Sequence, residues 1–222
     1  MISLHTHTIW SDGDLLPSEL ARRAEEMGYR FLAFTDHVDY SNIDEVVPAL
    51  VKVSACISRD SSIKVLPGVE ITHVPPVEIP PLVVRARELG AAIVAVHGET
   101  LVEPVVPGTN RMALNCDIDI LAHPGLLSEE DARCAAERSI HVEISSRKGH
   151  SLGNGRVVAL WYRYGFPLVL NTDTHAPEDL ITEEFARRLL IGAGVKEADV
   201  AGIFDTGYAL AEKRYGHSLV RE

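Results

Sequence analysis

Short apolar segments alternate with longer amphipathic segments along most of this chain. The apolar segments are residues 2–4, 31–35, 64–69, 92–96, 118–122, 141–144 and 168–171. Each has the length of a strand, and helical stretches with one apolar face follow them. This alternation is typical of parallel βα units. The pattern therefore predicts an α/β fold with seven parallel strands.

Several helix boundaries are marked by particular residues. Pro17 suits the first turn of a helix over residues 17–28, and Ser128 and Thr182 suit N-cap positions ahead of acidic residues. Further helices are predicted over residues 45–59, 81–89 and 157–164, and one or two closing helices over 197–215.

Histidines and carboxylates recur where the predicted strands end. They are His5 and His7, Asp36 and His37, Glu70, His97, His123, and Asp173 with His175. Six of the seven strands thus carry a ligand-type side chain. In a parallel barrel these ends share one face, where active sites are built, whereas an open sheet would spread them along an edge. The positions favour a barrel with a metal site, because imidazole is among the commonest metal ligands.

Composition narrows the class of protein. Apolar residues make up 46% and charged residues 24% of 222 residues, so we expect a single globular domain over 1–222. The net charge of −11 disfavours long nucleic acids but permits a small anionic substrate that binds at a local positive site. No secretory signal or apolar run long enough to cross a membrane is visible. Three widely spaced cysteines are expected to be reduced and mostly buried, as in a cytoplasmic protein. The oligomeric state stays open.

The motifs together resemble those of the PHP family, the polymerase and histidinol phosphatase superfamily. They are His5-x-His7, Ser11-Asp12-Gly13, Thr35-Asp36-His37, Gly68-Val69-Glu70, His97, Ala122-His123-Pro124 and Asp173-x-His175. The resemblance implies a distorted (βα)7 barrel, similar to a TIM barrel, that binds two or three divalent metal ions. It also implies that the protein hydrolyses phosphoesters. With no residues left for a polymerase, the stand-alone phosphatase branch is the closer match.

The resemblance also assigns ligands to three metals. The first would take His5, His7, Glu70 and Asp173; the second Glu70, His97 and His123; the third Asp12, His37 and His175. Asp12 departs from members that carry histidine at this position. The donor set leaves zinc, manganese and iron open.

The expected chemistry is attack by a metal-bridging hydroxide on phosphorus. Asp173 is the candidate to orient this nucleophile or take its proton, and His175 to protonate the leaving group. Four loop residues are candidates for substrate binding, namely Arg111, Arg147, Lys148 and His150. Glu143 is expected inside the barrel, where it would orient a histidine.

The leading functional hypothesis is hydrolysis of a small phosphomonoester such as histidinol phosphate. A phosphodiesterase or nuclease acting on small nucleotides would use the same metal cluster. A metal-dependent amidohydrolase ranks third, because Glu70 stands where that family typically carries a carboxylated lysine. A non-catalytic metal-binding domain would keep the ligands without turnover.

Overall fold

The computed structural model describes residues 1–219. Its strands are β1 (Ile2–Ser3), β2 (Phe31–Phe34), β3 (His37–Val38), β4 (Lys64–Ile71), β5 (Ile93–His97), β6 (Ile120–Ala122), β7 (His141–Ser145) and β8 (Leu168–Asn171). The helices are α1 (Pro17–Glu26), α2 (Ile43–Asp60), α3 (Ile79–Leu89), α4 (Thr109–Leu114), α5 (Glu129–Arg138), α6 (Asn154–Tyr164), α7 (Glu183–Gly192) and α8 (Val200–Leu219). Every predicted strand and helix is present, and two short elements, β3 and α4, were not predicted.

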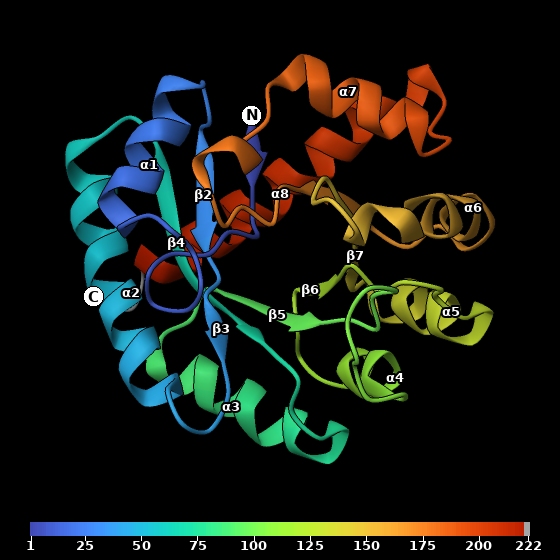
Figure 1. Cartoon of the computed structure of the whole chain (residues 1–222), viewed down its shortest axis with the longest axis horizontal. Helices are drawn as coiled ribbons and strands as arrows, with labels where there is room; N and C mark the ends of the chain where they lie inside the picture. The colour runs from blue at the N-terminus through green and yellow to red at the C-terminus, as the bar shows by residue number, and fades with distance from the viewer. Residues whose placement is uncertain (220–222) are drawn as a thin grey trace.

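The strands form a parallel sheet in the order β1-β2-β4-β5-β6-β7-β8, with β3 pairing to β4. Phe34 lies opposite Pro67 and His37 opposite Glu70, so the pairing with β4 resumes without a change of register after a two-residue break. β2 and β3 therefore occupy one strand position. The seven positions form a nearly closed ring (Figure 1), which confirms the predicted distorted (βα)7 barrel.

The ring closes between β8 and β1 beyond the ends of both strands. The backbone N–H of Asp173 donates to the carbonyl of His5 at 2.9 Å, and that of His7 donates to the carbonyl of Thr174 at 2.8 Å. The first and last ligand-bearing segments are thereby held side by side, although more than 160 residues separate them in the sequence.

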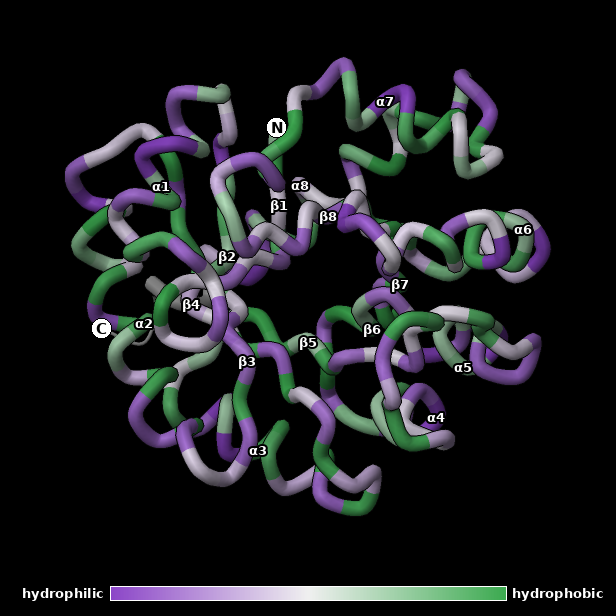
Figure 2. The backbone as a smooth tube through the Cα atoms, in the orientation of Figure 1, coloured by the Kyte–Doolittle hydropathy of each residue, from purple (hydrophilic) through white to green (hydrophobic). Residues whose placement is uncertain are grey.

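Two apolar layers support the ring. One lies between the sheet and the surrounding helices, which in Figure 2 alternate between hydrophobic and hydrophilic stretches as amphipathic helices do. The other fills the barrel with side chains such as Leu4, Leu66 and Ile120, and is continued by Leu210 and Ala211 of α8. Helix α8 passes behind the strands in Figure 1, so it covers the end of the barrel opposite the metal ligands.

A buried carboxylate anchors α8. Asp119, the residue before β6, pairs with Arg214 Nε at 2.6 Å and with Arg87 Nη2 at 2.7 Å. Its Oδ2 also accepts the backbone N–H of Val94 at 2.8 Å. The carboxylate is thus fully paired, as a buried charge must be.

Two sequence expectations on capping are confirmed: Ser128 accepts a hydrogen bond from the Asp131 N–H and Thr182 from the Phe185 N–H. The expectation for the cysteines is only partly correct, since Cys116 is buried, Cys134 half-buried and Cys56 exposed. Within residues 1–219, no helix combines the length and apolar character needed to cross a membrane.

Candidate metal centre

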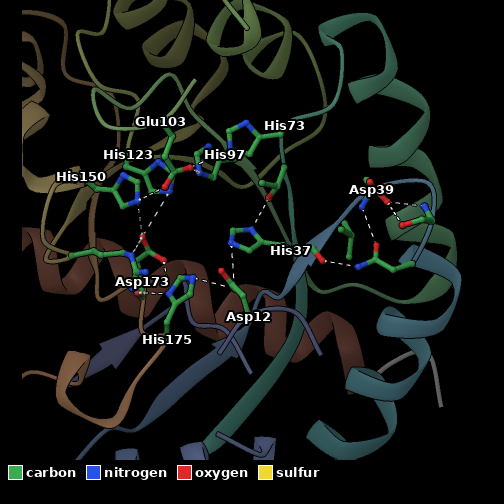
Figure 3. Close-up of a pocket in the computed structure, with 15 residues that line it drawn as sticks. Asp12, His37, Asp39, His73, His97, Glu103, His123, His150, Asp173 and His175 are labelled. Carbon is green, nitrogen blue, oxygen red and sulfur yellow. Dashed lines mark hydrogen bonds and ion pairs between the residues drawn. The ribbon is translucent and has the colours of Figure 1, made fainter. Parts of the chain in front are cut away.

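The C-terminal ends of the strands bring six of the nine predicted ligands to one pocket of about 380 Å³ (Figure 3), and the other three, His5, His7 and Glu70, lie buried beside them. His5 and His7 leave β1 on the same face, since alternate residues of extended chain point the same way. Both are fully buried, as is Glu70 near the end of β4. The turn after them is tight: a Cβ at Gly13 would lie 2.4 Å from the carbonyl oxygen of His7, so only glycine fits there.

The first group of donor atoms has the spacing of a metal site. His5 Nε2 lies 3.4 Å from Glu70 Oε2 and 3.6 Å from Asp173 Oδ1. His7 Nε2 lies 3.7 Å and 3.3 Å from the same two oxygens. Ligands at 2.0–2.1 Å from a tetrahedral ion are about 3.4 Å apart, so these four atoms surround a space of the right size.

Buried polar atoms without hydrogen bonds concentrate in these residues. Among the described side chains, seven such atoms belong to five predicted ligands: His5 Nε2, both ring nitrogens of His7, both oxygens of Glu70, His123 Nδ1 and Asp173 Oδ2. Leaving one such atom unpaired costs about 1–3 kcal/mol. A cation would satisfy most of them at once, so the residues present fit a metal.

The second group of donor atoms includes more residues than the resemblance implied. His123 Nε2 lies 3.2 Å from Glu70 Oε1, the oxygen that faces away from His7. His97 lies with His123 and His150, all three offering nitrogens within 4.8 Å of one another. His97 Nε2 is also 3.0 Å from Glu103 Oε2. Sequence reasoning missed Glu103, because nothing in the pattern of a loop shows where its side chain points.

The third group is more open. Asp12 Oδ1 lies 3.2 Å from His175 Nε2 and 3.5 Å from His37 Nε2, and His7 is close enough to join them. The Asp12 side chain is 58% exposed, against 0% for Glu70. Asp12 therefore brings a carboxylate to this group from the solvent side.

A second layer of side chains holds the ligands in place. Glu143 Oε2 accepts from His5 Nδ1 at 2.7 Å, which confirms the expectation that Glu143 orients a histidine. Thr72 Oγ1 lies 2.7 Å from His37 Nδ1. Asp36, which follows β2, accepts hydrogen bonds from the backbone and hydroxyl of Thr8 and so fixes the turn that carries Asp12.

The buried carboxylates and imidazoles shift one another's pKa values: burial opposes the charged forms, but neighbouring carboxylates raise the pKa values of His5 and His123. Burial alone would raise the pKa of Glu70, but His5, His97 and His37 hold the pKa of this carboxyl well below its usual value. Burial and the neighbouring His123 lower the pKa of His150 to about 3. His150 is therefore neutral at neutral pH, the state in which an imidazole can bind a metal.

Backbone strain is located at the same residues. Within residues 1–219, four residues other than glycine have positive φ, and three line the pocket: His73 (55°), His123 (22°) and Asp173 (50°). Such conformations cost about 1–3 kcal/mol each and persist where the surroundings enforce them.

The structure divides the predicted substrate-binding residues. Arg147 and His150 line the pocket, and Arg147 Nη1 donates to the Asp173 carbonyl at 3.2 Å. Arg111 does not reach it: this residue lies on α4, not on a loop, and pairs with Asp131 and Glu130. Lys148 is exposed and is not among the residues that line the pocket. The structure therefore does not bring Arg111 and Lys148 to the pocket with the other two.

Comparisons with known proteins agree with this geometry. The model of the PHP domain family matches residues 3–138. The chain is 46% identical over 198 residues to "Uncharacterized protein MJ1295" of Methanocaldococcus jannaschii, covering 88% of this chain and 91% of that protein.

Two solved structures share the fold. A chain of archaeal ribonuclease P with mature tRNA superposes with a TM-score of 0.76 at 19% identity, covering 96% of this chain and 91% of that chain. Histidinol phosphate phosphatase from Lactococcus lactis subsp. lactis, complexed with zinc, L-histidinol and phosphate, superposes with a TM-score of 0.59 at 16% identity, covering 88% and 94%. At such identities the superpositions show the fold alone. The family match, which spans more than half of the residues, shows that this chain belongs to the PHP domain family.

Proposed function

We propose that this protein is a metal-dependent phosphoesterase that hydrolyses a small phosphomonoester of the histidinol phosphate type. The observation that carries the proposal is the placement of the Glu70 carboxylate. Its Oε2 faces His5 and His7 while its Oε1 faces His123, as in a carboxylate that bridges two cations. Family membership supports the phosphoesterase class, and the L. lactis phosphatase supports the kind of substrate.

His5, His7 and Asp173 would hold one cation and His123 another, with Glu70 shared between them. Two bound divalent cations supply a water of lowered pKa and positive charge for the phosphoryl oxygens. Imidazole and carboxylate donors suit zinc, manganese or iron. A third cation would bind Asp12, His37 and His175.

Protein groups around the pocket would do the rest. Asp173 Oδ2 has no hydrogen bond, so it is free to orient the attacking water or take its proton. With no ion in the third site, His175 Nε2, beside Asp12 at the open side, would be free to protonate the leaving oxygen. Arg147 is a fixed cation for the phosphate, because Asp179 and the Asp173 carbonyl hold its guanidinium.

The size and charge of the pocket favour a small substrate. A volume of about 380 Å³ is at the lower end of the range for small-molecule sites. The rim carries the carboxylates of Asp12, Asp39 and Glu103, and the net charge is −11. This negative rim opposes the phosphate backbone of a long nucleic acid.

The test combines elemental analysis with phosphate release from histidinol phosphate, nucleoside monophosphates, cyclic dinucleotides and a generic phosphodiester. We expect at least two equivalents of metal, turnover on a monoester, and loss of turnover in His7→Ala and Asp173→Ala with the circular dichroism spectrum unchanged. Turnover on diesters alone would refute the monoesterase proposal. Metal binding without turnover on any ester would refute catalysis.

Arg147→Met tests the phosphate contact. Loss of a charge-assisted hydrogen bond costs about 1.5–3 kcal/mol, so we expect kcat/KM to fall about 10–100-fold. Arg133→Met removes an exposed arginine from α5, outside the pocket lining, and serves as the matched control. Equal activities of the two variants would remove Arg147 from the site.

A further inference from the structure

Two side chains beyond the predicted ligands point into the second group of donors. They are His150, on the loop after β7, and Glu103, on the loop after β5. Figure 3 shows both beside His97 and His123, at the same side of the pocket. Neither belongs to the ligand set that the motifs imply.

His150 is oriented in the way that two of the predicted ligands, His5 and His37, are. Its Nδ1 lies 2.6 Å from Thr100 Oγ1, just as His5 Nδ1 and His37 Nδ1 meet Glu143 and Thr72. With Nδ1 occupied, Nε2 is directed into the pocket, 3.7 Å from Asp173 Oδ2 and 3.5 Å from Glu103 Oε1. A partner on one nitrogen that fixes the other toward a metal is the usual second layer of a metal-binding histidine.

The ring of His150 is also parallel to that of a predicted ligand. Its centroid is 4.1 Å from the His123 centroid with an interplanar angle of 16°, and the side chain is buried. A cation bound by both imidazoles would account for their common orientation.

Glu103 approaches the group from the other side. Its Oε2 lies 3.0 Å from His97 Nε2, and its Oε1 faces His150. The loop is fixed at its base, because Glu99 Oε1 accepts the N–H groups of Gly108 and Asn110. The loop that carries Glu103 also lies against the loop that carries His150. Val102 is so close to Gly149 that a Cβ added to this glycine would lie 3.2 Å from Val102 Cγ2.

We propose that His150 is an additional ligand of the second metal site, which it forms with His97 and His123, and that Glu103 completes the donor set. This assignment rests on the proposed function and departs from the sequence expectation that His150 binds substrate. The separations of 3.0 Å and 3.5 Å from Glu103 to the two histidines bracket the distance of about 3.4 Å between ligands of a tetrahedral ion. With the shared Glu70, the site would offer three imidazoles and two carboxylates, donors that suit zinc.

The test measures metal binding directly. Full-length protein is stripped of metal and titrated with zinc against a chromophoric chelator, and bound zinc is counted by elemental analysis at a fixed free concentration. The variants are His150→Ala and Glu103→Gln. His73→Asn is the matched control, because His73 also contacts Glu103, at 3.1 Å, and asparagine tolerates its positive φ.

We expect His150→Ala to bind one equivalent fewer than the unmodified protein, with affinity for that ion lowered about 100-fold, since even outer partners of a ligand contribute 10–100-fold. Glu103→Gln should lower the same affinity about 10-fold or more. His73→Asn should stay within about twofold, because it removes no proposed ligand.

Unchanged zinc affinity and stoichiometry in His150→Ala would overturn the proposal. A rise in KM alone in this variant would instead make His150 a substrate contact. If only His73→Asn and Glu103→Gln lose zinc affinity, the ion binds at His73, His97 and Glu103. That result would also overturn the proposal. Failure of the proposed function would register separately, as an unmodified protein that binds its ions but releases no phosphate.

Discussion

Replacing Glu143 by glutamine tests whether the layer behind the ligands sets metal affinity. The fully buried carboxylate receives three donors: His5 Nδ1 at 2.7 Å, Asn171 Nδ2 at 3.0 Å and the His123 backbone N–H at 3.4 Å. Glutamine has nearly the same shape but only one acceptor oxygen. Its NH2 group must therefore face a donor, and His5 also loses the negative charge behind its ring.

The magnitude follows from these contacts. A hydrogen bond to a charged group contributes about 1.5–3 kcal/mol, and loss of an outer partner of a metal-binding histidine lowers affinity about 10–100-fold. The two figures agree, because 10–100-fold corresponds to about 1.4–2.7 kcal/mol. We expect the zinc dissociation constant of the first site to rise by that factor, with kcat/KM falling in parallel at subsaturating metal.

The assay is zinc titration of stripped protein against a competing chelator, with circular dichroism as the check on folding. Glu137→Gln, which removes the same charge from an exposed position on α5, is the control. If Glu143→Gln binds zinc within about twofold of the unmodified protein, the hydrogen bond to His5 does not tune the site and the reasoning fails.

Three further predictions concern stability. Metal is expected to bind only the folded chain. When the free metal concentration is about 1,000 times the dissociation constant, its removal by a chelator should lower the free energy of unfolding by about 4 kcal/mol and Tm by about 10 °C. An unchanged Tm would contradict a metal-stabilised centre. Arg214→Ala should lower the free energy of unfolding, measured in urea, by about 2 kcal/mol. A buried charge left without any partner costs about 3–5 kcal/mol, but Asp119 keeps its second arginine. The control Arg22→Ala, on the exposed face of α1, should cost under about 1 kcal/mol. Gly125→Ala should cost about 3 kcal/mol in the same titration, since φ is +62° and the new Cβ would lie 2.0 Å from the Glu99 carbonyl oxygen; an unaffected midpoint would mean that this turn relaxes freely.

The fold was predictable because long elements carry periodic patterns. The break between β2 and β3 was not, because Thr35 reads as a continuation of the strand and only pairing with the long β4 defines β3. Helix α4 has six residues, too few for a helical period to stand out, so Arg111 was expected on a loop.

The same difference between regular strands and short or irregular segments applies to the residues of the site. Side chains at strand ends could be placed from the sequence, since alternation in a strand fixes direction and a parallel barrel brings the ends together. Side chains on loops and on the short helix α4 could not, because tertiary contacts decide their direction. Arg111 is held away from the pocket by Asp131, whereas Glu103 is held over it by the loop that Glu99 closes.

Strain and unpaired polar atoms meet at the same ligands, and this coincidence bears on how the fold and the site depend on each other. His123 and Asp173 both have positive φ, and both carry buried polar atoms without hydrogen bonds. Each feature alone costs about 1–3 kcal/mol, so the folded chain is less stable at these points than its apolar core would allow. Neither cost improves barrel packing, because the strained residues follow the strands. A cation between the donors would satisfy the unpaired atoms, so that part of the stability lost in folding the empty site becomes affinity for the metal, while the strained backbone keeps the donors in position.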